Sequence, residues 1–167
     1  TEGKTSALLG IPVGGALFCA GIDPGLCQAF EDAAAKLGVL FQIQDDILDI
    51  YGNKGRDRPA SDIYEGKISA LAVDFFESPA TAGEKHRVLE ILRQPRAQTN
   101  ESMVNEVLAL FARYEILQRC QKRLENYQTD LRQNAVLDRL PPIKAYLVEL
   151  TQKFLEPIRE LSVKVRA

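Results

Sequence analysis

The chain has 167 residues, of which 46% are hydrophobic and 26% charged, and its formal net charge is −2. This size and composition are typical of one ordinary globular domain and argue against a disordered chain, so we expect a single domain over residues 1–167. The balanced charge does not predict binding to nucleic acid or to an anionic membrane surface, because either partner would favour a basic patch.

The cysteines and the start of the chain bear on its cellular context. Cys19, Cys27 and Cys120 form no C-x-x-C pair and leave an odd one over, which predicts reduced thiols with a packing role. The sequence contains no apolar run of about 18 residues and no signal-like start, so neither stable membrane insertion nor export is predicted and the cytosol is the default. Because the chain opens at Thr1, without methionine, directly in the dense stretch TEGKTSALLG, we expect a fragment.

Helical periodicity dominates the chain. Apolar residues recur at i, i+3 and i+4 in segment after segment, and strand alternation is nowhere sustained, so the predicted fold class is all-α. The first helix is expected at about residues 1–20, kinked or thinned by its glycines and by Pro12. Asp23 is then predicted to be the N-cap, and Pro24 the first residue, of a long helix that runs to Tyr51.

The second half of the chain is predicted to contain about four more helices. The stretch GNKGRDRPAS, with two glycines and a proline among charges, is the clearest loop. The expected helices that follow it lie at residues 62–77, 82–94, 101–137 and 142–165. We expect the third of these to break near Arg113.

The stretch FQIQDDILDI, from Phe41 to Ile50, places three aspartates inside an apolar run. At about 100° per residue, Gln42, Asp45, Asp46 and Asp49 fall within one arc of a helix. Nearly all other directions are covered by apolar side chains, and this pattern is typical of a buried helix. The acidic stripe is therefore expected to face an internal cavity.

Buried carboxylates need partners, because an unpaired buried charge costs several kcal/mol. Arginine or lysine side chains are one possibility. Mg²⁺ is the other, since it takes carboxylate oxygens and usually shares its coordination sphere with water and substrate phosphate. From these residues alone, a salt-bridged structural helix and a metal site remain equally open.

Three motifs occur in order: KTS near the start, FQIQDDILD in the middle, and SDIYEGKIS after a basic loop. In combination they resemble the isoprenyl diphosphate synthases, the trans-polyprenyl family that makes geranyl, farnesyl and geranylgeranyl diphosphates. The resemblance rests on specific motifs over residues 1–71 and on helical pattern beyond them. It implies an all-α bundle around a deep central cavity, of which this chain would be the C-terminal half.

The resemblance also implies roles for the residues of the three motifs. Asp45, Asp46 and Asp49 would hold Mg²⁺ against the diphosphate of an allylic substrate, and the lysines, Lys4 and Lys67, would contact the same diphosphate as point charges. The metal and the lysines would stabilise the departing anion, while a dry apolar pocket would shield the cation from water.

Two polar residues, Thr5 and Gln42, match the groups that steady the carbocation formed when the diphosphate leaves. Phe41, beside Gln42, is placed with the substrate-binding residues. No titrating histidine is required, so His86 is expected on the surface of an amphipathic helix.

Each assignment has a structural alternative. Lys4 could be solvated at a frayed helix end, and Thr5 could cap or back-bond its own helix. Gln42 could simply hydrogen-bond an aspartate, and Lys67 could form a surface salt bridge to Glu65. The basic loop residues Lys54, Arg56 and Arg58 could close over phosphate, but a solvated charge run is the preferred interpretation.

The chain also departs from the family pattern. Many relatives have a glycine two residues before the aspartate of the D-x-x-E-G-K element, where this chain has Ala60 followed by Ser61. The first Asp-rich motif and the arginines that bind isopentenyl diphosphate beside it are missing.

The predicted function is prenyl transfer, the Mg²⁺-assisted condensation of isopentenyl diphosphate with an allylic diphosphate, by a protein that is a homodimer when complete. A non-catalytic half-bundle that pairs with another chain is an alternative. A class I terpene cyclase or an unrelated helical protein is a third, although DDILDIYG lacks the Asn/Asp-x-x-Ser/Thr-x-x-x-Glu site of cyclases. Product chain length is not predicted.

Overall fold

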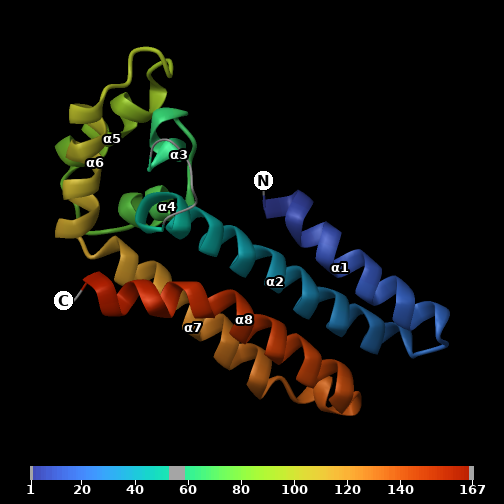
Figure 1. Cartoon of the computed structure of the whole chain (residues 1–167). Helices are drawn as coiled ribbons and strands as arrows, with labels where there is room; N and C mark the ends of the chain where they lie inside the picture. Colours follow the sequence, from blue (N-terminus) through green and yellow to red (C-terminus); the bar gives the residue numbers. More distant parts are fainter. Residues whose placement is uncertain (1, 53–58, 166–167) are drawn as a thin grey trace. The chain divides into compact units, whose positions relative to one another are not determined.

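The computed structural model describes residues 2–52 and 59–165. Within these residues the protein contains eight α-helices, one 3₁₀ helix and no strand, which confirms the all-α prediction (Figure 1). The elements in chain order are α1 (Glu2–Cys19), α2 (Pro24–Tyr51), α3 (Ser61–Tyr64), α4 (Ala70–Phe76), α5 (Ala82–Arg93), α6 (Glu101–Arg113), α7 (Ile116–Gln133), η1 (Ala135–Arg139) and α8 (Pro141–Val165).

The first two helices follow the signals in the sequence. The side chain of Asp23 accepts a hydrogen bond from the N–H of Leu26 at 3.1 Å, and Pro24 is the first residue of α2, so the predicted cap and start are confirmed. The helix continues to Tyr51, as expected. Helix α1 is continuous, with Pro12 inside it.

Two expected helices are divided in the structure. The helix predicted at residues 62–77 is two short helices, because Gly66 takes a positive φ of 66° and residues 67–69 leave the helical conformation. The side chain of Ser69 then caps α4 by accepting a hydrogen bond from Ala72 N–H. The helix predicted at residues 101–137 breaks after Arg113, as expected, at Glu115 with its φ of 53°.

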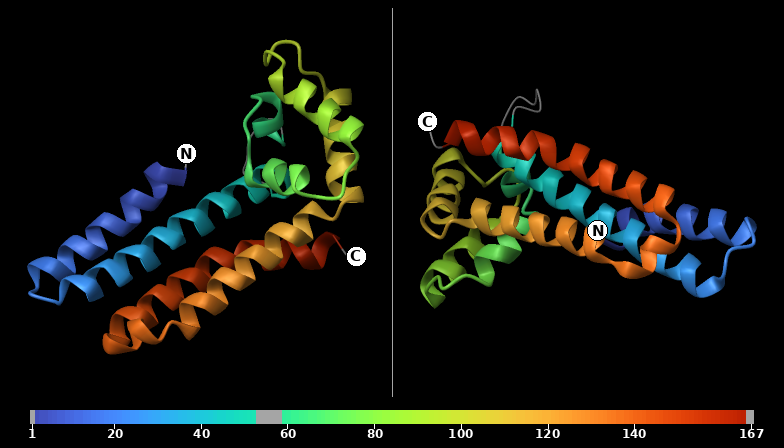
Figure 2. Two further views of the ribbon diagram at one scale, coloured as in Figure 1. Left: turned by 180° about the vertical axis from the view of Figure 1, so that it is seen from behind. Right: turned by 90° about the horizontal axis from the view of Figure 1, so that it is seen from below.

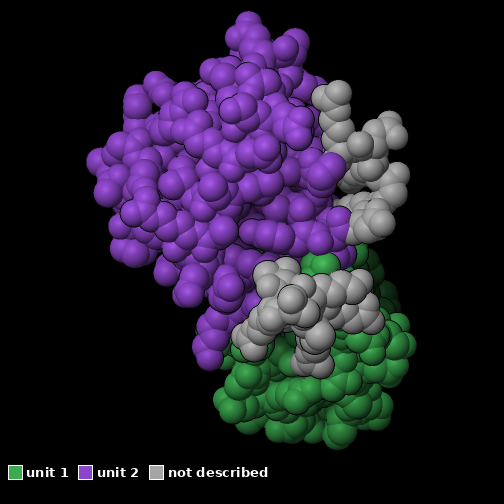
Figure 3. All heavy atoms as spheres, turned by 60° about the vertical axis from the view of Figure 1, so that its left-hand side comes forward, with its two compact units in different colours: residues 1–44, 123–167 green, residues 45–122 purple. Residues whose placement is uncertain are grey.

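The described chain separates into two compact units (Figure 3). Unit 1 comprises residues 1–44 and 123–167, and unit 2 comprises residues 45–122. Both α2 and α7 therefore contribute residues to each unit. The expectation of one domain over residues 1–167 remains a prediction.

In unit 1, α1 and the first part of α2 lie side by side and antiparallel (Figures 1 and 2). Glycines allow the two backbones to approach closely: a Cβ atom at Gly38 would come within 2.7 Å of the carbonyl oxygen of Thr5, and one at Gly10 within 3.1 Å of the carbonyl oxygen of Glu31. The glycines of α1 thus thin the helix rather than interrupt it.

Unit 2 is built on an aromatic cluster. The buried ring of Phe75 in α4 lies 5.6 Å from that of Phe111 and 5.9 Å from that of Tyr114, measured between centroids. The thiol of Cys120 in α7 donates a hydrogen bond to the buried carboxylate of Asp74 at 2.8 Å. These contacts fix α4 against α6 and the start of α7. They also hold Ala70, the first residue of α4, which contacts Asp46 near the end of α2.

Cys19, Cys27 and Cys120 are thiols rather than halves of disulfides in this structure. Cys27 and Cys120 are buried and have the expected packing role, whereas Cys19 is exposed. Among the described helices, none has the length and apolar character needed to cross a membrane.

Candidate functional site

The acidic turn of α2 belongs to unit 2. Asp46 and Asp49 are buried, with 5% and 3% of their surface exposed, and Asp45 is half-buried. The neighbouring Ile47 is fully buried. The expectation that the aspartates lie on a largely buried stretch of helix is therefore confirmed.

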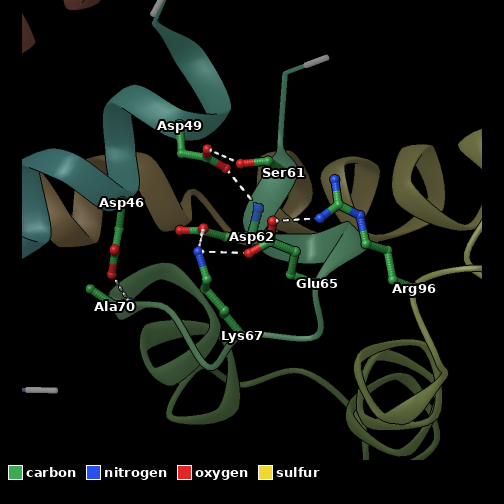
Figure 4. Close-up of polar contacts among 8 residues, drawn as sticks. All are labelled: Asp46, Asp49, Ser61, Asp62, Glu65, Lys67, Ala70 and Arg96. Carbon is green, nitrogen blue, oxygen red and sulfur yellow. Dashed lines mark hydrogen bonds and ion pairs between the residues drawn. The ribbon is translucent and has the colours of Figure 1, made fainter. Parts of the chain in front are cut away.

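The two buried aspartates contact groups of the segment that follows α2 (Figure 4). The Oδ1 atom of Asp49 accepts a hydrogen bond from the Ser61 hydroxyl at 2.5 Å, and its Oδ2 atom accepts one from Asp62 N–H at 2.9 Å. The Oδ2 atom of Asp46 accepts a hydrogen bond from Ala70 N–H at 2.6 Å. Backbone N–H groups and a hydroxyl are thus among the partners of these buried carboxylates, in addition to the basic side chains and the metal ion considered from the sequence.

Lys67 lies between these two anchor points in the chain, since it follows Asp62 and precedes Ala70 (Figure 4). Its Nζ atom is 2.7 Å from Asp62 Oδ1 and 2.9 Å from Glu65 Oε2, so the salt bridge to Glu65 that we considered as an alternative does form. The hydrogen bond to Asp62, and then that to Glu65, raise the pKa of the Lys67 ammonium above its ordinary value. Lys67 therefore carries its charge throughout the physiological pH range.

The Lys67 ammonium is still able to act on a ligand. Its side chain is 55% exposed. An ammonium group has three N–H donors, and two of them serve the carboxylates of Asp62 and Glu65. The third can reach a phosphate oxygen, so ion pairing within the segment and diphosphate binding are compatible.

The carboxylate oxygens of the acidic turn are the kind of ligand that Mg²⁺ takes. Within residues 2–52 and 59–165, no group of three or more His, Cys, Asp or Glu side chains is placed to hold a metal ion by itself. Mg²⁺, however, is commonly bound through one or two carboxylates, with substrate phosphate and water completing its octahedron. The half-buried carboxylate of Asp45 fits that kind of shared site. The assignment of Asp45, Asp46 and Asp49 as metal ligands remains a prediction.

Four other predicted site residues belong to unit 1. Thr5 and Gln42 are half-buried, and the backbone of Thr5 packs on Gly38, one turn before Gln42 along α2. Phe41 is 44% exposed, and its ring packs edge-to-face on that of Phe154 in α8 at 5.6 Å. Lys4 lies in α1, and its side chain is outside the described part of the structure. The substrate roles of these residues remain predictions.

The two remaining basic assignments have different outcomes. The loop residues Lys54, Arg56 and Arg58 lie outside the described residues. The side chain of His86 is 73% exposed and lies 3.3 Å from Glu90, which confirms its expected place on the surface of a helix.

Sequence reasoning assigned no role to two residues that shape the site. Asp62 is buried and joins Asp49 to Lys67, and its signal was its place at the head of the D-x-x-E-G-K element. Ala60 is buried with φ 59° and ψ 37°, a left-handed conformation that glycine adopts freely and other residues rarely take. The glycine of relatives at this position was the signal for that turn.

A pocket of about 430 Å³ lies beside the anchored segment and is lined by Ser61, Tyr64, Arg96, Ala97 and Thr99. Arg96 donates a hydrogen bond to Glu65 at 3.0 Å, so the rim of this pocket is connected to the carboxylate that holds Lys67.

The helical fold and this site agree with one class of protein. The model of the polyprenyl synthetase family matches residues 1–111, and the chain belongs to that family. The matched range includes both the acidic turn of α2, residues 45–49, and residues 61–70, which we call the Lys67 segment.

Curated relatives support the assignment. The chain is 32% identical over 113 residues to a short chain isoprenyl diphosphate synthase of Methanothermobacter thermautotrophicus, covering 66% of this chain and 33% of the relative. It is 34% identical over 100 residues to a short chain isoprenyl diphosphate synthase of Methanocaldococcus jannaschii, covering 59% and 30%. It is 29% identical over 155 residues to a geranylgeranyl pyrophosphate synthase of Geoglobus acetivorans, covering 92% and 46%.

The chain thus spans between about a third and just under half of the length of these relatives. No solved structure matches the chain significantly.

Proposed function

We propose that this chain forms the allylic-diphosphate side of a prenyltransferase that condenses isopentenyl diphosphate with an allylic diphosphate. The observation that carries the proposal is the connection of the acidic turn of α2 to the Lys67 segment through Asp46 and Asp49. Membership of the polyprenyl synthetase family supports it.

In the proposed reaction, the role of this chain is electrostatic. Asp45 would hold Mg²⁺, which supplies charge to neutralise the diphosphate as the bond from carbon to oxygen breaks. Lys67 would donate a hydrogen bond to the same departing group, and Lys4 is proposed as the second such donor. These fixed charges act where negative charge develops, which is the arrangement that lowers a barrier most effectively.

The carbocation left behind needs polar groups nearby and protection from water. Thr5 and Gln42 are proposed to present their oxygens to it, and Phe41 to line the substrate chain. The packing of Thr5 against α2 one turn before Gln42 supports this pairing. Exclusion of water by apolar walls would prevent capture of the cation as an alcohol.

The second function that we propose is that of a non-catalytic half-bundle that pairs with another prenyl synthase chain. In either case we propose homodimeric or paired assembly in the complete protein. Three cysteines without a C-x-x-C pair support a reducing compartment such as the cytosol.

The test is binding of an allylic diphosphate in the presence of Mg²⁺, measured by isothermal titration calorimetry. Lys67→Ala and Lys4→Ala should each weaken binding by about 1.5–3 kcal/mol, the range for a hydrogen bond to a charged group. Lys→Arg should not restore it fully, because a planar fork does not replace a point charge. In a complete synthase, Asp45→Ala should also lower turnover about a hundredfold or more, a loss typical of removing one electrostatic stabiliser.

Wild-type affinity in both alanine variants would contradict the proposed diphosphate site. A chain that binds diphosphate in this way but transfers no prenyl group, even beside a complete synthase partner, would favour the second function.

A further inference from the structure

The two buried aspartates of the acidic turn bracket the Lys67 segment. Asp49 contacts its beginning, through Ser61 and the N–H of Asp62, while Asp46 contacts its end, through the N–H of Ala70 (Figure 4). The carbonyl oxygen of Asp49 also accepts a hydrogen bond from Ala60 N–H at 2.8 Å. Both ends of the segment are therefore fastened to one turn of α2.

Asp62 connects Asp49 to Lys67 by hydrogen bonds. The N–H of Asp62 is held by Asp49, and its carboxylate receives the Lys67 ammonium at 2.7 Å. Its carbonyl oxygen also accepts a hydrogen bond from Lys67 N–H at 2.9 Å. One residue thus fixes both the backbone and the charged end of Lys67, and that residue is placed by Asp49.

We propose that Asp46 and Asp49 are positioning residues, which set the Lys67 ammonium in place through the segment that they anchor. This inference rests on the proposed function, because it concerns the same diphosphate site.

Substitution by asparagine distinguishes a positioning residue from a metal ligand. A backbone N–H needs an acceptor oxygen, which the amide of asparagine provides as well as a carboxylate does. A Mg²⁺ ligand in this site needs the negative charge, which asparagine lacks. Asp→Asn therefore preserves anchoring and abolishes metal binding, while Asp→Ala abolishes both.

The geometry of Asp49 permits this exchange. One of its oxygens accepts from Asp62 N–H and the other from the Ser61 hydroxyl. In Asp49→Asn the amide oxygen can keep the N–H of Asp62, and the amide NH₂ can donate to Ser61, whose hydroxyl is also an acceptor. In Asp46→Asn the amide oxygen can likewise accept the hydrogen bond from Ala70 N–H.

The first measurement does not depend on catalysis or on a metal. Amide hydrogen exchange is measured in the metal-free full chain. In Asp46→Ala, the Ala70 N–H loses its acceptor and should exchange about tenfold faster or more. In Asp49→Ala, the same acceleration is expected for the Asp62 N–H, which loses its acceptor, and for the Lys67 N–H, which bonds to the carbonyl of Asp62. The corresponding Asn variants should stay near the wild-type rates. Unchanged exchange in both alanine variants would overturn the proposal, whatever the chain binds.

The second measurement is Mg²⁺-dependent binding of inorganic pyrophosphate. Asp45→Asn should lose at least about tenfold in affinity, equivalent to about 1.4 kcal/mol, while Asp46→Asn and Asp49→Asn should stay within about threefold of wild type. If either of these variants lost as much as Asp45→Asn, with its amides still protected, that residue would be a metal ligand and the proposal would fail.

A double-mutant cycle completes the test. If Asp49 acts through Lys67, Asp49→Ala should weaken pyrophosphate binding in the wild-type background and add little further loss to Lys67→Ala. Full additivity would indicate an effect that bypasses Lys67 and would overturn the positioning role. Absence of any pyrophosphate binding by the wild-type chain would instead count against the proposed function, and the exchange rates would still decide the anchoring.

Discussion

At the scale of the residue, Gly66 controls the path of the Lys67 segment. Its φ is +66°, and a Cβ atom there would collide with the carbonyl oxygen of Leu92 at the end of α5. Gly66→Ala should therefore lower the free energy of unfolding by at least about 1–2 kcal/mol, the cost of a left-handed backbone for an L-residue, with the collision adding to it.

Urea denaturation measures this loss, and Gly83→Ala is the matched control. Gly83 lies in the first turn of α5, and a Cβ atom there would meet nothing within 4 Å. This control should be neutral or gain about 0.5–1 kcal/mol, because alanine is the better helix former. Equal stability of the two variants would show that the turn at Gly66 tolerates a side chain.

At the scale of the element, the start of α5 is stabilised by the carboxylate of Glu84, whose pKa is lowered. Glu84 forms a capping box with Thr81 and accepts a hydrogen bond from the Tyr114 hydroxyl at 2.7 Å. The hydrogen bond from Tyr114, followed by those from Thr81 and the charge of Arg113, lowers the pKa of Glu84 from 4.5 to about 2.

A depressed carboxylate pKa stabilises the folded state above the pKa of the unfolded chain and loses that contribution as the pH falls. The stabilisation by Glu84 should thus be complete above about pH 4.5 and disappear toward about pH 2. Chemical denaturation across this range should show a smaller acid-induced loss of stability in Glu84→Gln than in the wild type. Parallel losses in the two proteins would assign the acid sensitivity to other groups.

The contact of α1 with α2 depends on the absence of a side chain at Gly38. A Cβ atom there would come within 2.7 Å of Thr5 O and 2.8 Å of Ser6 N, and these are backbone atoms of a helix that cannot move singly. Gly38→Ala should cost about 1–3 kcal/mol, the usual range for overpacking. Thermal unfolding measures the effect.

Gly15 offers the control for this change, since it lies in α1 and a Cβ atom there meets no atom within 4 Å. Gly15→Ala should leave the melting temperature unchanged or raise it. A neutral Gly38→Ala would mean that α1 can shift away from α2 without cost.

At the scale of the whole molecule, α1 presents large apolar side chains to solvent. Leu8, Ile11 and Phe18 are 71%, 60% and 65% exposed, and Gly15 and Ala16 lie among them. Extended apolar patches on a protein surface mark association sites. We expect the 167-residue chain by itself to self-associate, and sedimentation velocity measures this.

Charged substitutions on α1 test whether this face is responsible. Leu8→Glu together with Ile11→Glu should shift the chain toward the monomer, whereas Val136→Glu, at a residue of η1 that is 47% exposed, should not. A monomeric wild-type chain at high concentration would contradict the expectation.

Sequence and tertiary structure contributed differently to these conclusions. The bounds of α2 followed from Asp23 and Pro24, because a cap acts over three residues and is visible in the local sequence. The family followed from the order of three motifs, because each keeps its chemistry within a few positions.

The division between α3 and α4 was decided by tertiary structure, since the turn at Gly66 is packed against Leu92 of a different helix. The partners of Asp46 and Asp49 were also decided there. Their hydrogen-bond donors lie 12 to 24 residues further along the chain, and periodicity within one helix carries no information at that separation. By itself, the sequence determined that these carboxylates had to be satisfied, because buried charge is costly in any fold. Only the folded chain decided which groups satisfy them, since backbone N–H donors look alike in every sequence.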